Sequence, residues 1–291
     1  MLAHSQYVGN TMDTMSVGSV NYIGVSGVSS PEQQCELREH ADKVFDGLDA
    51  TLALGVKAVH KTQWLDVPNK YGEAWYPVGE ERFSNAVSRL GRTDNIAQMY
   101  LDPETLAADP QYATNFIRRV KQRGQNWLHI IQFDMLPYHE APEALSYIIH
   151  EAKRDVDLHE YLVVVQCHEP AMSEGPKRAV EKLKRLSPDE IDFVLFDASH
   201  GTGREMNPDS LKPFLEEVHN DTDIDLMGVG IAGGLDAVTV EKHLPPLLTE
   251  YPMLSWDAEG RLHQTPDGHL NMAAAKAYLT ASAAVLSRLS S

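Results

Sequence analysis

The chain has 291 residues, of which 43% are apolar and 23% are charged, a globular composition long enough for one large domain or two small ones. Lysine and arginine number 25 against 42 aspartates and glutamates, which gives a net charge of −17. Such a chain repels a polyanionic backbone, so we expect no nucleic-acid partner. The two cysteines, Cys35 and Cys167, are too few for a disulfide framework and suit a reducing, cytoplasmic compartment.

Residues 1–19 mix small and polar residues and lack the apolar core of a signal peptide. No later run of about 18 apolar residues occurs, so we expect no contact with a membrane. We interpret residues 1–19 as a leader outside the folded domain, with disorder as one alternative, and residues 20–291 as a single domain.

Short β-branched and apolar runs alternate with longer amphipathic stretches, the pattern typical of βα units and a parallel sheet. Several helical stretches begin with Ser-Pro or Asn-Pro, where proline fits the first turn. The predicted strands are Asn21–Ser26, Lys57–Lys61, Asn95–Leu101, Trp127–Phe133, Tyr161–Gln166, Asp192–Phe196, Leu226–Ala232 and Met253–Trp256. Eight such units predict a closed (β/α)8 TIM barrel, which needs about 250 residues. A doubly wound open sheet is the alternative, but no G-x-G-x-x-G follows the first strand.

The main excess over a minimal barrel lies between the second and third predicted strands, at residues 62–93. This insertion carries aromatic residues among prolines and glycines, namely Trp64, Tyr71, Trp75, Tyr76 and Phe83. A long aromatic connection at that end of a barrel predicts a lid or a partner surface. A loop with its own small core on the flank of the barrel is the alternative.

Polar residues gather at the predicted strand ends. Residues two apart on a barrel strand share a side, and three strands end in such polar pairs: Gln132 and Asp134, Gln166 and His168, and Asp197 and Ser199. The same alternation adds Ser26, Tyr100, Asp102, Ser255 and Asp257, and the second strand offers His60 or Lys61. Since the helix layer needs apolar partners, we expect the polar set at the C-terminal mouth of the barrel. For any single member, a hydrogen-bonded core residue or a helix cap is the alternative.

Two glycine-containing segments follow the sixth and seventh predicted strands. Residues 197–204 include His200, Gly203 and Arg204, and residues 230–236 include Ala232, Gly233 and Gly234. Backbone N–H groups in such turns, reinforced by a helix N-terminus, suit a phosphate group. Barrels often bind phosphate with the loops after strands seven and eight, so these turns predict a phosphate site.

These segments resemble phosphoribosylanthranilate isomerase, a tryptophan-pathway barrel that converts an aminoaldose to an aminoketose. The similar segments are Val194-Leu195-Phe196-Asp197 with Gly201-Thr202-Gly203-Arg204 on strand six, Ile231-Ala232-Gly233-Gly234-Leu235 on strand seven, Ile131-Gln132 on strand four, and Val25-Ser26-Gly27-Val28 on strand one. The resemblance implies that Asp197 is a general acid that opens the sugar ring. It also places Ser26 where the family has its basic cysteine. A hydroxyl is a weak base at neutral pH, so His168, His60 and Asp134 are the alternatives for the base.

The resemblance therefore implies an isomerase that acts on a phosphorylated sugar or ribosyl-phosphate compound without a cofactor or a metal. Asp197, His168, Ser26 and Asp134 are the expected catalytic residues. Substrate binding is expected from His60, Lys61, Gln132, Gln166, His200 and Arg204, and phosphate binding from Gly203, Ala232, Gly233, Gly234 and Gly260. A homodimer is compatible with the sequence and not specified by it.

Two other functions remain open at this point. One is a metal-assisted hydrolase or lyase that uses His60, Asp134, His168, Glu169 and His200, since histidines and carboxylates at strand ends are common metal ligands. The other is a non-catalytic barrel that binds a ligand and uses the aromatic insertion as a contact surface.

Overall fold

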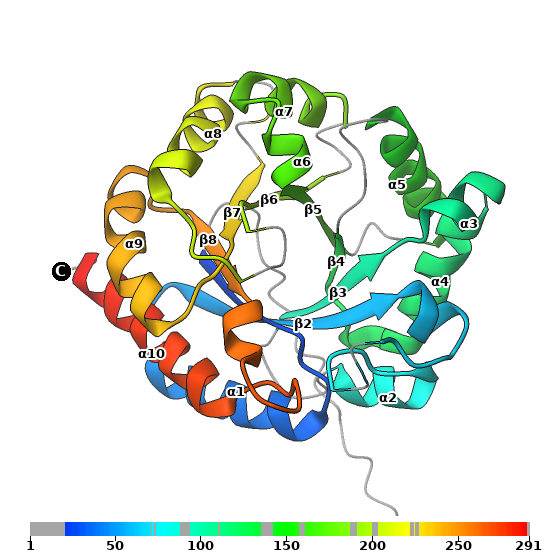
Figure 1. The fold of residues 1–291 in the computed structure, drawn as a ribbon, viewed down its shortest axis with the longest axis horizontal. Coiled ribbons are helices and arrows are strands. Elements are labelled where there is room, and N and C mark those ends of the chain that lie inside the picture. Colours follow the sequence, from blue (N-terminus) through cyan, green and yellow to red (C-terminus); the bar gives the residue numbers. More distant parts are fainter. Residues whose placement is uncertain are drawn as a thin grey trace, which may run out of the picture.

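The structure, a computed structural model, describes residues 21–70, 72, 74–87, 94–109, 111–134, 142–156, 161–186, 191–199, 203–221, 224 and 227–289. The predicted leader, Tyr71 and His200 lie outside the described residues. The described chain closes into a barrel of parallel strands whose spatial order follows the sequence from β1 to β8 (Figure 1). The prediction of a (β/α)8 barrel is therefore confirmed.

The strands of the barrel are all paired in parallel, and β1 pairs with both β2 and β8 to close the ring. Their bounds are β1 (Asn21–Ser26), β2 (Ala50–Val59), β3 (Asp94–Tyr100), β4 (Ile130–Phe133), β5 (Leu162–His168), β6 (Phe193–Asp197), β7 (Gly228–Ala232) and β8 (Ser255–Ala258).

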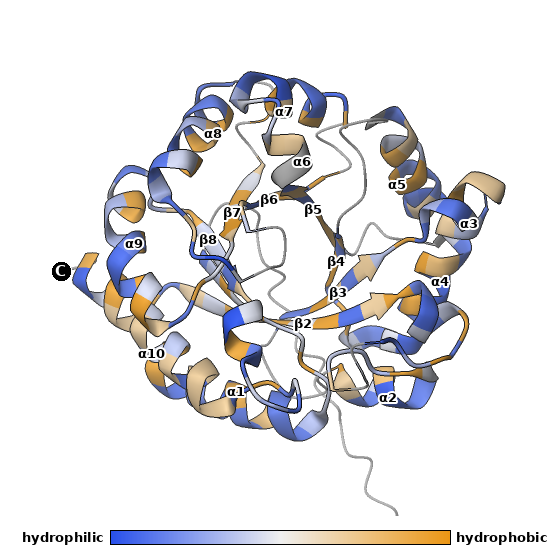
Figure 2. Cartoon of the chain, viewed as in Figure 1, coloured by the Kyte–Doolittle hydropathy of each residue, from blue (hydrophilic) through white to orange (hydrophobic). Residues whose placement is uncertain are grey.

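Helices surround the strands as an outer ring, and Figure 2 shows hydrophilic and hydrophobic bands on α4, α8 and α9 of this ring. The helices are α1 (Pro31–Val44), α2 (Gly79–Ala86), α3 (Pro103–Ala108), α4 (Tyr112–Gly124), α5 (Pro142–Val156), α6 (Glu169–Met172), α7 (Pro176–Leu183), α8 (Pro208–Asn220), α9 (Ala237–Glu250) and α10 (Met272–Leu289). Three short helical turns, η1 (His60–Trp64), η2 (Gln125–Trp127) and η4 (Gly260–His263), lie in the connections.

Apolar side chains form two separate cores. The larger core lies between strands and helices and contains the outward residues of each strand, such as Leu52, Leu54 and Val56 of β2. The smaller core fills the barrel interior with Tyr22, Ala53, Ile96, Ile130, Val164, Phe193, Leu195 and Ala232. Because these residues occupy mainly the N-terminal half of the strands, the polar residues that follow them on the same side lie towards the C-terminal end of the barrel.

The second strand was predicted at Lys57–Lys61, but β2 runs from Ala50 to Val59 and therefore both starts and ends earlier than predicted. Gly55 lies inside β2 and not in a turn before it. A Cβ atom at Gly55 would lie 2.6 Å from Ser26 Oγ and 2.9 Å from Gln98 Oε1. The glycine is therefore needed for a close approach of side chains inside the barrel. As a result His60 and Lys61 belong to η1, beyond the last residue of the strand.

Candidate active site

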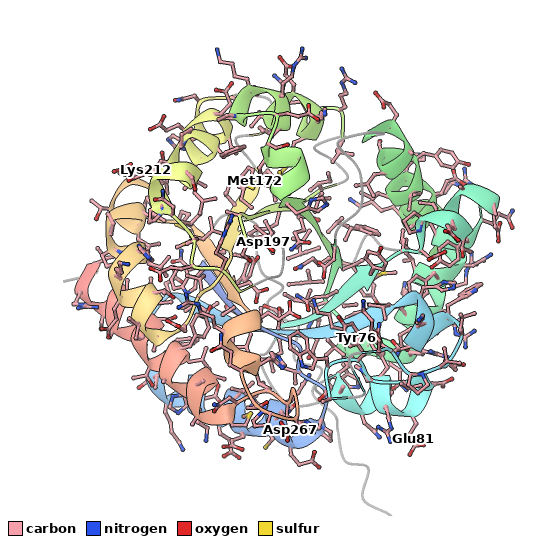
Figure 3. All side chains as sticks on the ribbon, in the orientation of Figure 1. Tyr76, Glu81, Met172, Asp197, Lys212 and Asp267 are labelled. Atoms are coloured by element: carbon pink, nitrogen blue, oxygen red, sulfur yellow. The ribbon has the colours of Figure 1, made fainter. Side chains whose placement is uncertain are left out.

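A cavity lies among the side chains at the carboxyl ends of the strands. Its volume is about 30 Å³, room for about two water molecules, so a larger ligand reaches it with one group only. Nine predicted site residues line it: Gln132, Asp134, Gln166, Asp197, Gly203, Ala232, Gly233, Gly234 and Gly260. Gln98, Ser199, Asp257 and Glu259 complete the lining. Figure 3 shows Asp197 inside the ring, whereas Lys212 and Glu81 lie out at the helices.

Asp257, on β8, ends a buried hydrogen-bond chain. The Ser26 hydroxyl lies 2.9 and 2.7 Å from its two carboxyl oxygens, and Gln98 Nε2 donates to the Ser26 oxygen over 2.6 Å. Burial raises the pKa of Asp257 to about 7, with the hydrogen bond from Ser26 opposing the shift and Glu259 adding to it. This carboxyl group changes protonation near neutral pH, as a general acid or base requires. Ser26 serves it as a hydrogen-bond donor.

Lys57, on β2, is the cation of the site, and it is not among the residues predicted from the sequence. Its ammonium lies 2.9 Å from Glu259 Oε2 and 3.3 Å from Asp134 Oδ2. Burial works to lower the pKa of Lys57, but Glu259 and Asp134 outweigh it and raise that pKa, so the ammonium stays charged. Gln132 Nε2 donates to the other Asp134 oxygen over 2.7 Å. One part of the cavity lining consists of three residues with carboxyl groups, Asp134, Asp257 and Glu259, and of the amide residue Gln98. We call this part the acidic wall.

Asp197, at the end of β6, is held by three donors. The backbone N–H and the hydroxyl of Ser199 both donate to Oδ1 over 2.8 Å, and Gln166 Nε2 donates to Oδ2 over 3.0 Å. The site thus contains one aspartate side chain that accepts hydrogen bonds from Ser199 and Gln166 and one carboxyl group that titrates near neutrality.

Ala232 separates these two aspartates. Asp197 pairs with Ala232, and Ala232 pairs with Asp257, in the register of β6, β7 and β8. Neighbouring strands are about 4.8 Å apart, so the two aspartates stand on either side of one short side chain. The gap above this methyl group is part of the cavity.

Glycines from three loops form another part of the cavity lining, which we call the glycine wall: Gly203, Gly233, Gly234 and Gly260. Three of them have positive φ angles, +70° at Gly203, +120° at Gly233 and +59° at Gly234. A Cβ at Gly234 would lie 2.3 Å from the Arg204 carbonyl oxygen. Glycine therefore lets these loops pack directly on one another and present backbone to the cavity.

The charges beyond the glycine wall are largely paired. Asp236 caps α9 in a capping box with Thr239. Arg261 Nη1 contacts Asp236 Oδ2 over 2.9 Å, and Nη2 lies 3.5 Å from Glu205 Oε2. The Arg204 side chain is exposed and contacts the Ala198 carbonyl over 3.5 Å, which places one guanidinium near this rim.

His60 and Lys61 are not brought to the cavity. His60 Nδ1 lies 2.7 Å from the Tyr112 hydroxyl, on the side of α4, and Lys61 is exposed on η1. The two-residue alternation of a strand no longer applies in a helical turn. Lys57 is the first residue of the predicted strand and shares a side with Lys61 in the same alternation, so the missed cation was readable from the sequence.

His168 lies at the end of β5, is 4% exposed and stands in register with Asp197, but it does not line the cavity. Cys167, its neighbour, packs in the core between strands and helices, on the other side of the strand as its position in the alternation predicts. His200 lies outside the described residues.

Two further polar residues of the strand-end set take ordinary structural roles. Asp102 caps α3 by accepting hydrogen bonds from Thr105, and Ser255 Oγ accepts from the backbone N–H of Tyr22 deeper in the barrel. Tyr100 is 37% exposed. The alternation therefore selects the correct side of each strand but does not say how far along the strand the cavity lies.

The aromatic insertion has parts on the flank and parts near the mouth. Phe83 is fully buried, and Trp64 packs edge-on against Tyr112 of α4. The centroid of the Trp75 ring instead lies 4.1 Å from the centroid of the His263 ring. His263 Nε2 is in turn 3.1 Å from the Ser26 carbonyl oxygen. This contact joins the connection after β2 to the loop after β8 across the end of β1.

Within the described residues, no group of three or more histidine, cysteine, aspartate or glutamate side chains is arranged to hold a metal ion. Of the residues named for that function, Asp134 pairs with Lys57 and His60 faces Tyr112.

Comparisons with known proteins identify the fold. Searches with family models and among curated proteins found no match. One similar solved structure is the alpha subunit of tryptophan synthase from Legionella pneumophila str. Paris, with 14% sequence identity, a TM-score of 0.52 and 92% of each chain covered. A GH18 chitinase from Pseudoalteromonas aurantia has 11% identity and a TM-score of 0.54, with 84% of this chain and 97% of that chain covered. Triosephosphate isomerase from Bartonella henselae has 10% identity and a TM-score of 0.50, with 92% of this chain and 99% of that chain covered. Within the described part of the chain, no helix is both long and apolar enough to cross a membrane.

Proposed function

We propose that the protein is an acid–base isomerase that moves a proton between neighbouring carbon atoms of a small phosphorylated sugar. The observation that carries this proposal is the pair formed by Asp197 and Asp257 on either side of Ala232. One carboxylate is stabilised by three donors, and the other carboxyl group has a pKa of about 7. Two titratable groups in such different environments suit the separate roles of base and acid.

The two aspartates complete the proton transfers between them. The Asp197 carboxylate removes the proton from the carbon next to an aldehyde, while protonated Asp257 donates its proton to the aldehyde oxygen. The enediol that forms then returns to a carbonyl compound. Asp257 takes the proton of the neighbouring hydroxyl group, and Asp197 delivers its proton to the former aldehyde carbon. Both groups regain their starting forms, and an aldose has become a ketose.

The glycine wall supports a phosphate group on this substrate. Backbone N–H groups of such turns bind phosphate, and these turns lie in the loops after β6, β7 and β8, where barrels often bind it. Arg204 adds a positive charge near the rim. The similarity of these loops to those of phosphoribosylanthranilate isomerase supports this orientation, whereas the role of Asp197 differs: the resemblance implies a general acid and the proposal makes it the base.

Deuterium exchange on a small panel of sugar phosphates tests the proposal. Ribose 5-phosphate, glucose 6-phosphate, glucosamine 6-phosphate and glyceraldehyde 3-phosphate are incubated with the protein in D2O and followed by proton NMR. We expect deuterium at the carbon next to the carbonyl of at least one compound, with the rate reduced at least about 100-fold in Asp197→Asn and in Asp257→Asn.

Asp94→Asn is the matched control. Burial also raises the pKa of Asp94, to about 6, but this residue begins β3 at the opposite end of the barrel. We expect the variant to keep the wild-type exchange rate. Absence of exchange with all four compounds, or exchange that persists in both site variants, contradicts the proposal.

A further inference from the structure

The acidic wall has an excess of negative charge over positive charge. Three carboxyl groups belong to this wall, those of Asp134, Asp257 and Glu259. Lys57 is their only cationic contact among the described residues, and its ammonium is already shared by Asp134 and Glu259. Even with Asp257 half protonated at neutral pH, a ligand group that enters between these residues meets a negative potential.

Gln98 supplies an independent observation. Its side chain lines the cavity and is 1% exposed. When Asp257 is ionised, the Ser26 hydroxyl donates its hydrogen to Asp257, so the Ser26 oxygen accepts from Gln98, which places Nε2 on that side of the amide. Gln98 Oε1 is left buried with no hydrogen-bond donor in the described residues. A buried carbonyl oxygen without a donor is energetically costly, so a bound ligand is the expected source of the missing donor.

A cationic group with several N–H donors satisfies both observations. A hydroxyl group would supply a donor to Gln98 Oε1 but no positive charge. A bound divalent cation would supply charge, but it needs several oxygen ligands at short distance, and the described residues contain no suitable group of three acidic or histidine side chains.

We propose that the substrate of this isomerase carries a primary ammonium group, which donates to Gln98 Oε1 and lies against the acidic wall. Resting on the function proposed above, this inference narrows the substrate class to aminated sugar phosphates, with the ammonium at the acidic wall and the phosphate at the glycine wall. In glucosamine 6-phosphate the ammonium replaces the hydroxyl group on the carbon that loses its proton to Asp197, so Asp257 takes its proton from the ammonium and the product is the 2-iminium form of the ketose. The ammonium also withdraws electrons from this carbon and makes its C–H proton easier for Asp197 to remove.

Three ligands that differ at one position test the inference by titration calorimetry at pH 7. They are glucosamine 6-phosphate, glucose 6-phosphate and N-acetylglucosamine 6-phosphate, which present an ammonium, a hydroxyl and a neutral amide. We expect glucosamine 6-phosphate to bind the wild-type protein at least about tenfold more tightly than either of the others, since a hydrogen bond to a charged group is worth about that much or more. Equal or weaker binding of the ammonium compound overturns the inference.

Gln98→Met is the matched variant, because it keeps the length of the side chain and removes the carbonyl oxygen. We expect the preference for glucosamine 6-phosphate to fall to about threefold or less, and an unchanged preference contradicts the role of Gln98. If this variant does not fold, the three-ligand comparison on the wild-type protein still decides. Magnesium chloride is titrated in parallel, and tight binding of Mg²⁺ that excludes the sugar phosphates also overturns the inference.

The two proposals fail in different ways. Deuterium exchange without tighter binding of the ammonium compound supports the isomerase and contradicts the ammonium site. Tighter binding of the ammonium compound without deuterium exchange on any compound contradicts the isomerase and supports a barrel that binds an amine.

Discussion

The acidic wall and the glycine wall differ in what they present to a ligand. The acidic wall consists of three buried side chains and the half-buried Glu259, from β3, β8 and the residues that follow β4 and β8. Hydrogen bonds and Lys57 hold them in place. The glycine wall consists of backbone from three loops, and three of its four glycines have positive φ angles that other residues rarely adopt. Charge on the first wall is set by burial, whereas the second wall depends on the shape of the main chain. Substitutions should therefore act on the two walls by different mechanisms.

Lys57→Met should have the largest effect on stability, because it leaves Asp134 and Glu259 without their shared cation. Breaking a buried ion pair from one side is strongly destabilising, and we expect the free energy of unfolding to fall by about 3 kcal/mol in urea denaturation at pH 8. Lys61→Met, on the exposed surface of η1, is the control and should change it by less than about 0.5 kcal/mol. A loss below about 1 kcal/mol for Lys57→Met would show that the ion pairs of the acidic wall do not matter for the fold.

Gly234→Ala should be the most damaging alanine substitution in the glycine wall. It combines a φ angle of +59° with a Cβ position 2.3 Å from the Arg204 carbonyl oxygen, so the backbone of one loop has to move. We expect a loss of about 2–3 kcal/mol, measured by the same denaturation. Gly47→Ala shares the positive φ angle, +75°, but a Cβ there has nothing within 4 Å, so it should lose only about 1 kcal/mol. Equal losses would mean that loop packing is unimportant.

Asp257→Asn should stabilise the protein at high pH while it removes the proposed activity. Because the pKa of Asp257 is raised in the folded state to about 7, the folded protein holds this proton more tightly than the unfolded chain. The carboxyl group therefore costs nothing below about pH 4 and destabilises increasingly as pH rises from about 4 to about 7.

The corresponding gain for Asp257→Asn should be near zero at pH 4 and about 1–3 kcal/mol at pH 8, since about 4 kcal/mol from the shift is offset by weaker hydrogen bonds to Ser26. Thermal and urea unfolding at several pH values measure it. A gain that does not depend on pH, or a loss that grows towards pH 8, is incompatible with a buried carboxyl group of raised pKa.

The sequence predicted the glycine wall more completely than the acidic wall. Gly203, Gly233, Gly234 and Gly260 all line the cavity, because a glycine in a short βα turn is itself the signal. Asp134 and Asp197 were also predicted, since each follows an unbroken strand on which polar residues alternate with apolar ones. The barrel itself followed from the repeated alternation of strands and helices.

Lys57 and Gln98 were missed for two different reasons. Lys57 lay at the start of the predicted strand Lys57–Lys61, and the candidates were taken from its predicted end at His60 and Lys61, whereas β2 already ends at Val59. Gln98 shares a side of β3 with Tyr100, but its importance depends on the direction of the hydrogen bonds through Ser26. That direction, and the raised pKa of Asp257, arise from contacts between strands that are distant in sequence.

The most direct test of the account is the protonation of Asp257 itself. The protein is labelled with carbon-13 at the aspartate side-chain carboxyl, and the Asp257 signal is assigned by its absence in Asp257→Asn. Its chemical shift is then followed by NMR from pH 4 to pH 9. The account predicts a midpoint near pH 7. A midpoint near 4, the value of an ordinary exposed aspartate, would contradict it.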